Sequence, residues 1–130
     1  MADREPRPLT PPLVIQDLAA LELPPRKLDP YDREIGLLLV HEDADSGVEI
    51  YVVEYPAGMQ ARWHRHPAAH TILVLQGRLE VNGTVIGPAS LCRYAAATPM
   101  HHAPAGDARC RFVIVFEGAS DAEVVDPPAF

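Results

Sequence analysis

Short stretches rich in Val, Ile, Leu and Tyr recur along the middle of the chain, and Gly, Pro, Asp or Asn separate most of them. This pattern is typical of short strands bounded by turns. No helical repeat lies between the stretches, so the favoured architecture is an all-β antiparallel sandwich or barrel. The expected strands cover residues 35–41, 48–55, 71–76, 78–81, 84–86, 90–94 and 111–116.

The dipeptide Asn82-Gly83 marks the clearest turn between two of these strands. Both residues tolerate a positive φ, which a two-residue type I′ hairpin turn requires. We therefore expect residues 78–81 and 84–86 to pair as a hairpin.

The first 33 residues follow a different pattern, because prolines recur there and leave room for only one short helical turn, around residues 14–21. Their apolar side chains need a surface to cover them, so we expect an arm packed over the domain or along a partner subunit. The predicted organisation is a Pro-rich arm over residues 1–33 and a barrel over residues 34–130. The barrel ends in an acidic tail, which we expect to be a peripheral strand or a loose end.

Composition narrows the class of protein. A chain of 130 residues forms one domain, and 14 prolines spread along it are incompatible with long helices. The net charge of −7 argues against nucleic-acid binding and against docking on an anionic membrane. No apolar run is long enough to span a membrane, and the N-terminus lacks an apolar signal core, so a cytoplasmic protein is expected.

Histidines carry the candidate chemistry, since five of the six lie between His64 and His102. Residues i and i+2 of a strand share a face, so His64 and His66 would present two adjacent imidazoles. His70 follows Pro67, which allows a turn that returns to the same face. An imidazole from the pair His101-His102 would complete a shared metal site. His41 is expected to be a solvated surface residue.

Neutral imidazoles suit one divalent transition metal, which could be Fe, Zn, Ni, Mn or Cu, and do not suit Ca²⁺ or Mg²⁺. Without a carboxylate ligand the charge of the ion is uncompensated, so the site should attract an anionic ligand such as an enolate, a carboxylate or hydroxide. Four histidines closed around zinc would instead be structural. The two cysteines, Cys92 and Cys110, are too few for a disulfide scaffold or a Cys-based zinc site. No other catalytic motif is present, and no catalytic residue is assigned.

The histidine spacing resembles a known motif. Gly58-x5-His64-x-His66-x3-His70-x6-Gly77 is similar to the first cupin motif, G-x5-HxH-x3,4-E-x6-G, with His70 in place of the usual Glu. Residues 87–104 resemble a degraded second motif that keeps a histidine and lacks the PxG and the final Asn. This resemblance, over about residues 35–117, implies the antiparallel double-stranded β-helix, or jelly-roll barrel, of cupins.

Two branches of cupins are most similar. One is the ChrR-type metal-binding cupin, through Tyr55-Pro56-Ala57-Gly58 and His102-Ala103-Pro104. The other contains small dioxygenases that cleave β-diketones or hydroxyacetophenones at a mainly histidine iron site. The resemblance implies His64, His66, His70 and His102 as metal ligands, with His102 favoured over His101 by the His-x-Pro match.

These observations predict a small metal-binding cupin, in the first place an Fe-type dioxygenase-like enzyme acting on an enolisable or anionic small molecule. The alternatives are a non-catalytic cupin that senses a metal or ligand, and a zinc-dependent isomerase or cyclase. We also expect a homodimer in which the arm helps to cover the partner, because apolar arm residues alternate with prolines and cannot form a core of their own.

Overall fold

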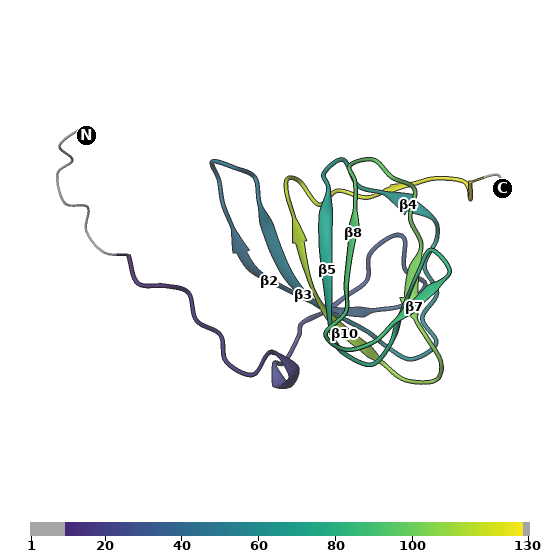
Figure 1. The fold of residues 1–130 in the computed structure, drawn as a ribbon, viewed down its shortest axis with the longest axis horizontal. Coiled ribbons are helices and arrows are strands. Elements are labelled where there is room, and N and C mark those ends of the chain that lie inside the picture. Colours follow the sequence, from purple (N-terminus) through teal and green to yellow (C-terminus); the bar gives the residue numbers. More distant parts are fainter. Residues whose placement is uncertain (1–9, 129–130) are drawn as a thin grey trace.

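Antiparallel sheets and one single-turn helix make up the computed structural model, which describes residues 10–128 (Figure 1). The helix is the 3-10 turn η1, Leu18–Ala20. The strands are β1 Pro25–Arg26, β2 Ile35–Glu42, β3 Glu49–Tyr55, β4 His64–Arg65, β5 His70–Gln76, β6 Leu79–Val81, β7 Thr84–Ile86, β8 Leu91–Tyr94, β9 His102–Pro104, β10 Cys110–Phe116 and β11 Glu123–Val124.

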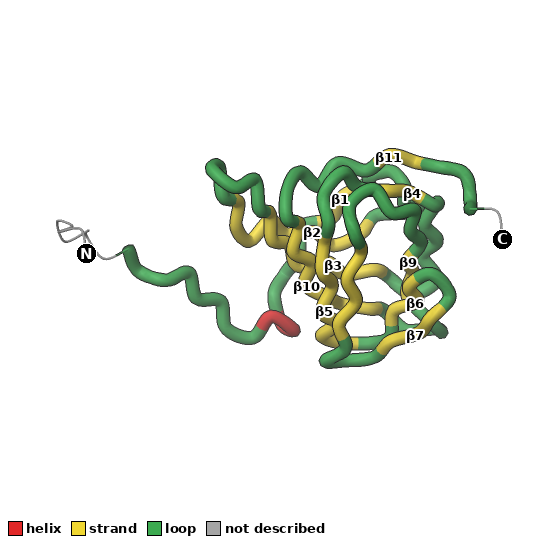
Figure 2. The backbone as a smooth tube through the Cα atoms, turned by 45° about the horizontal axis from the view of Figure 1, so that its top comes forward, coloured by secondary structure: helices red, strands yellow, loops and turns green. Residues whose placement is uncertain are grey.

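Six strands form the large sheet, in the order β1-β2-β3-β10-β5-β8. The long central strands β3, β5 and β10 alternate apolar residues between the two faces, and β10 pairs with β3 on one side and β5 on the other. Two small sheets, one of the two strands β11-β4 and one of the three strands β7-β6-β9, lie on the other side of the molecule (Figure 2).

One apolar core joins the large sheet to the small ones. Ile72 and Phe112 of the large sheet and Leu79 of β6 are almost completely buried in the same cluster. The all-β antiparallel prediction is confirmed, and each of the seven expected strands is found to within about a residue at either end. Among residues 10–128, no helix is long and apolar enough to cross a membrane.

Turns follow from residues that accept a positive φ. Asn82 and Gly83 have φ values of 46° and 91° between β6 and β7, as the hairpin prediction requires. Gly77 has a φ of 73°, and a side chain there would collide with the carbonyl oxygen of Arg109. This glycine, which ends the histidine motif, is therefore needed because the backbone of the β9–β10 loop lies against it.

The second half of the N-terminal arm joins the large sheet, whereas residues 10–16 extend away from it (Figures 1 and 2). Strand β1 pairs with β2, and the carbonyl of Leu18 accepts a hydrogen bond of 2.8 Å from the buried guanidinium of Arg111. Residues 1–9 of the arm and 129–130 of the tail lie outside the described residues. The tail contributes β11, the peripheral strand that pairs with β4. The division of the chain at residue 33 stays a prediction.

Candidate metal centre

Four histidines from three parts of the chain meet inside the barrel. His64 lies on β4 and His66 directly after it, His70 begins β5, and His102 begins β9. The exposed fraction of each residue is 7% or less. The site forms because β4 bonds to Met100 just before β9, while His70 lies opposite Phe116 and Tyr94 in the large sheet.

The imidazole rings are neighbours in space. The ring centroids of His64 and His66 are 5.1 Å apart, those of His66 and His70 are 4.9 Å apart, and those of His64 and His102 are 5.3 Å apart. Rings bound to one ion through nitrogens at about 2.1 Å would have centroids roughly 4.5–5.3 Å apart. The observed spacings fall in this range.

Backbone carbonyls orient three of the rings. Nδ1 of His64 donates to the carbonyl of Arg62 at 2.9 Å, and Nδ1 of His66 donates to the carbonyls of Ser120 and Asp121, both at 2.9 Å. Nδ1 of His70 lies 3.4 Å from the carbonyl of its neighbour two residues back, Ala68. Because a carbonyl only accepts, each of these rings carries its proton on Nδ1 and has a lone pair on Nε2.

The ring of His102 is held by a tyrosine instead. The Tyr55 hydroxyl lies 2.6 Å from Nδ1 of His102 and donates its own proton to the Tyr31 hydroxyl at 3.0 Å. Tyr55 therefore accepts from His102, which again leaves the lone pair on Nε2. Burial raises the pKa of both tyrosines, so both hydroxyls stay neutral.

Three of the Nε2 atoms have no partner. Nε2 of His64, His70 and His102 is buried and makes no hydrogen bond. Buried nitrogens without a partner are costly, and several in one place need an explanation such as an ion. In the side-chain conformations of this structure, no group of three or more His, Cys, Asp or Glu residues within residues 10–128 has the geometry to hold an ion.

Burial keeps these imidazoles neutral. The pKa of His64 and that of His70 both fall from 6.5 to about 4, chiefly through burial, and the nearby His66 contributes to the shift of His70. Burial also lowers the pKa of His66, and it lowers that of His102 well below its ordinary value. Neutral imidazole is the form that coordinates a metal, so the environment favours ligation at neutral pH.

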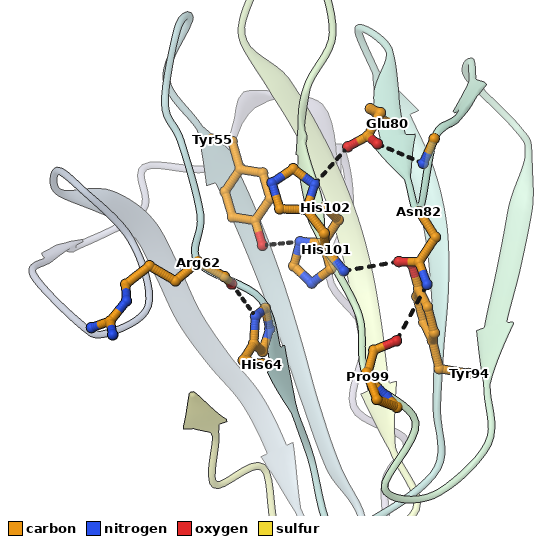
Figure 3. Close-up of polar contacts among 10 residues, drawn as sticks. Tyr55, Arg62, His64, Glu80, Asn82, Tyr94, Pro99, His101 and His102 are labelled. Carbon is orange, nitrogen blue, oxygen red and sulfur yellow. Dashed lines mark hydrogen bonds and ion pairs between the residues drawn. The ribbon is translucent and has the colours of Figure 1, made fainter. Parts of the chain in front are cut away.

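The two remaining histidines lie elsewhere. Nδ1 of His101 pairs with the Glu80 carboxylate at 3.0 Å (Figure 3). The ring of His101 lies 5.6 Å from that of Trp63. His101 thus turns away from the buried cluster that includes His102. His41 is exposed at the end of β2. Cys110 is buried, Cys92 is partly buried, and both are free thiols.

A cavity of about 180 Å³ opens beside the cluster. His66 and His102 reach its wall, and aromatic and aliphatic side chains make up most of the rest. No Lys or Arg is among the lining residues, and Asp29 is the one charged residue there. Arg62, two positions before His64 in the chain, lines a separate surface hollow near Trp63. The other lining residues of the cavity are Leu28, Pro30, Tyr31, Ile35, Leu37, Tyr51, Val53, Tyr55, Phe112, Ile114, Phe116, Ser120 and Ala122.

Sequence reasoning missed the partners that orient the rings. Tyr55 lies 47 residues before His102, and the carbonyls of Ser120 and Asp121 lie more than 50 residues after His66. No local spacing links such groups. The only sequence signal was the Tyr at the start of the Tyr55-Pro56-Ala57-Gly58 segment that precedes the motif.

Comparison with solved structures identifies the fold. No protein-family model matches the sequence, and no curated protein matches it. Solved structures do match: an acetylacetone dioxygenase from Acinetobacter johnsonii has a TM-score of 0.73 at 15% identity, over 97% of this chain and 85% of that one. A cupin-like protein from Thermotoga maritima has a TM-score of 0.70 at 15% identity, over 82% of this chain and 86% of that one.

A third match has a different activity. A DMSP lyase from Ruegeria pomeroyi has a TM-score of 0.62 at 17% identity, over 77% of this chain and 56% of that one. The chain therefore has the cupin fold, the antiparallel double-stranded β-helix indicated by the histidine motif. Since dioxygenases and lyases share it, the fold does not decide the reaction.

Proposed function

We propose that the chain is a metal-dependent enzyme that cleaves a small enolisable carbonyl compound with O₂. His64, His66, His70 and His102 would hold one divalent transition metal. The observation that carries the proposal is the set of buried Nε2 atoms without partners, beside an apolar cavity. When bound, a redox-active metal such as iron would supply the Lewis acidity and electron transfer that the reaction needs.

The four imidazole donors determine which further ligands the metal would favour. Four neutral imidazoles leave the charge of a divalent ion uncompensated, because His70 stands where most cupins carry a carboxylate. An enolate oxygen is a suitable counter-charge. The lining residues of the cavity include no Lys or Arg that would recognise a separate carboxylate or phosphate group. These features favour a substrate whose only negative charge is the enolate itself.

The cavity side chains have definable roles. Phe112, Phe116 and Ile114 supply an apolar wall that excludes water from the histidine cluster. Tyr31 accepts from Tyr55, and its own hydroxyl proton has no acceptor among the described residues. That proton is available to a carbonyl oxygen of a ligand in the cavity, so Tyr31 would orient the substrate. A volume of about 180 Å³ suits a compound of a few carbon atoms.

Metal analysis and oxygen consumption test the proposal together. The untagged protein is purified, its metals are quantified, and apo-protein is reloaded separately with Fe²⁺ and Zn²⁺. Uptake of O₂ with a small β-diketone by the iron form, and none by the zinc form, would support it. Tightly held zinc with no O₂ uptake would instead favour a structural or sensing site, and turnover by the zinc form without O₂ would favour an isomerase or cyclase. Either result would overturn the dioxygenase assignment.

A further inference from the structure

The segment between β10 and β11 crosses one end of the barrel without regular structure (Figure 1). Within residues 10–128, the hydrogen bonds from residues 118–122 to other parts of the chain go only to two residues of β3 and to His66. Ser120 and Ala122 of this segment line the cavity beside the histidine cluster. Few hydrogen bonds therefore fix a segment that forms part of the wall of the candidate site.

The carboxylate of Glu49, the first residue of β3, holds Ser120 at two points. Its Oε2 accepts from the backbone N–H of Ser120 at 3.0 Å, and its Oε1 accepts from the Ser120 hydroxyl at 2.9 Å. The Tyr51 hydroxyl donates to the same Oε1. Strand β3 is paired with β2 on one side and β10 on the other, so the carboxylate stands on a strand that is anchored along its length. Glu49 thus fixes the position of Ser120 against the large sheet.

The carbonyl of Ser120 orients one of the four clustered histidines. It accepts from Nδ1 of His66 at 2.9 Å, and the carbonyl of the next residue, Asp121, accepts from the same atom at 2.9 Å. A proton held on Nδ1 leaves the lone pair on Nε2, the nitrogen that would bind an ion. A continuous chain of hydrogen bonds therefore runs from the Glu49 carboxylate through Ser120 to the ring of His66.

Strand pairing alone does not favour a glutamate at position 49. Glu49 lies directly opposite Glu42 of β2, and like charges opposite each other in an antiparallel pair are destabilising. Glu42 is exposed, whereas Glu49 is partly buried and accepts hydrogen bonds from Tyr51 and Ser120. A partly buried carboxylate beside a like charge needs a compensating role, and its bonds to Ser120 indicate that role.

We propose that Glu49 is a positioning residue of the metal site, acting through Ser120 on the ring of His66. The inference rests on the proposed function, because it takes His66 as a ligand. Glu49 is not among the residues that line the cavity, so it acts through Ser120 rather than on a substrate. By holding both the N–H and the hydroxyl of Ser120, it keeps the carbonyls of residues 120 and 121 where they retain the His66 proton on Nδ1.

Competition for Zn²⁺ with a chelator of known affinity tests this role in the full-length protein. Glu49→Ala should weaken Zn²⁺ binding about 10–100-fold. Glu42→Ala is the matched control, since it removes the opposite carboxylate from an exposed position, and it should change the affinity by less than about 3-fold. Glu49→Gln should also stay within about 3-fold of the parent, because its amide can accept from the Ser120 N–H and donate to the hydroxyl oxygens. Unchanged affinity in Glu49→Ala, or equal losses in Glu49→Ala and Glu49→Gln, would overturn the proposal.

The His66 ring of the metal-free protein gives a readout that a general loss of stability would not move. Nitrogen-15 NMR at about pH 8, where imidazoles are neutral, distinguishes a proton on Nδ1 from one on Nε2. We expect Nδ1–H in the parent, Glu42→Ala and Glu49→Gln, and a mixture of the two forms in Glu49→Ala. Ser120→Ala loses only the hydroxyl, so it should shift both readouts in the same direction by a smaller amount, and it decides the matter if Glu49→Ala does not fold. A His66 ring that is unchanged in the folded variants would refute the role of Glu49.

His66→Ala separates this inference from the proposed function. If this variant binds Zn²⁺ as tightly as the parent, His66 is not a ligand, and both the four-histidine site and the role of Glu49 are wrong. If His66→Ala loses Zn²⁺ while Glu49→Ala keeps the affinity of the parent, the metal site stands and only the role of Glu49 is refuted. Loss of affinity in both variants, with Glu42→Ala unaffected, is the result we expect.

Discussion

The hydroxyl oxygen of Tyr55 lies 2.6 Å from Nδ1 of His102, and the two rings stack with centroids 5.4 Å apart. This contact determines which nitrogen of His102 carries the proton, because Tyr55 has already given its own proton to Tyr31. The partners that hold the Nδ1 atoms of metal-binding histidines commonly set ring orientation and ligand basicity. Tyr55 would play that part here, where the other rings use carbonyls.

Replacing Tyr55 by Phe should therefore weaken metal binding while the fold is kept. Phe preserves the stacking on His102 and removes only the hydroxyl, so we expect a loss of roughly 10–100-fold in metal affinity. Competition with a chelator of known affinity measures it. Ser46→Ala is the control, since it also removes a hydroxyl, one that lies in the exposed β2–β3 turn and accepts from the backbone N–H of Val48. Equal affinity for the two variants would contradict the role of Tyr55.

Substitution of His101 and substitution of His102 should have different effects on the metal content of the protein. Nε2 of His102 is buried without a partner, whereas His101 is paired with Glu80 on the far side of the strand. We expect His102→Ala to lose most of the bound metal and His101→Ala to keep it. Elemental analysis of both variants after identical purification gives the answer. The reverse result would transfer the ligand role to His101.

Runs of Val, Ile, Leu and Tyr bounded by turn residues predicted the strands of the barrel, and they were sufficient because β2, β3, β5 and β10 are seven or eight residues long. The motif spacing indicated that the histidines would meet, and the structure brings their rings together. Their role as metal ligands stays a prediction. Strands β1, β4, β9 and β11 have two or three residues and carry no periodic signal. The contact of Tyr55 with His102 depends on long-range packing and leaves no local pattern.

Gly77 should tolerate no side chain. It has a left-handed φ, and an added Cβ would collide with the backbone of Arg109, which cannot move as a flexible side chain would. Gly77→Ala should lower the free energy of unfolding by roughly 2–5 kcal/mol. Gly87→Ala is the control, since nothing lies within 4 Å of a Cβ there, and it should change stability by about 1 kcal/mol or less. Urea denaturation measures both, and similar stabilities would refute the argument.

The stability of the metal-free protein should fall with pH below neutrality. Folding lowers the pKa of His64 and His70 from 6.5 to about 4, so between these values the unfolded chain binds more protons than the folded chain. Stability is therefore full above pH 6.5 and is lost progressively as the pH falls toward 4, by up to about 3 kcal/mol for each ring. Urea midpoints measured across this range test it.

A control variant isolates the buried rings in that experiment. His41 is exposed, so His41→Gln should keep the same slope of stability against pH. Added metal should steepen the loss at low pH, because protons compete with the ion for the same nitrogens. If the stability of the metal-free protein did not change between pH 6.5 and 4, folding would not lower the pKa of the buried histidines, and the argument would be wrong.

His70→Glu tests the departure from the usual cupin motif. His70 begins β5 at the centre of the cluster, stacked on Tyr94, with its Nε2 buried and unpartnered. A carboxylate there would supply a ligand oxygen and cancel one positive charge, so we expect the variant to retain metal. In the apo form the same carboxylate would be buried without a counter-ion, which is costly. The gain in melting temperature on adding metal should therefore be larger for His70→Glu than for the parent. His70→Ala, which offers no ligand and no charge, should bind metal more weakly than either, and calorimetry of the three proteins with and without metal measures this order. If His70→Glu loses its metal while His70→Ala keeps it, residue 70 is not part of the site.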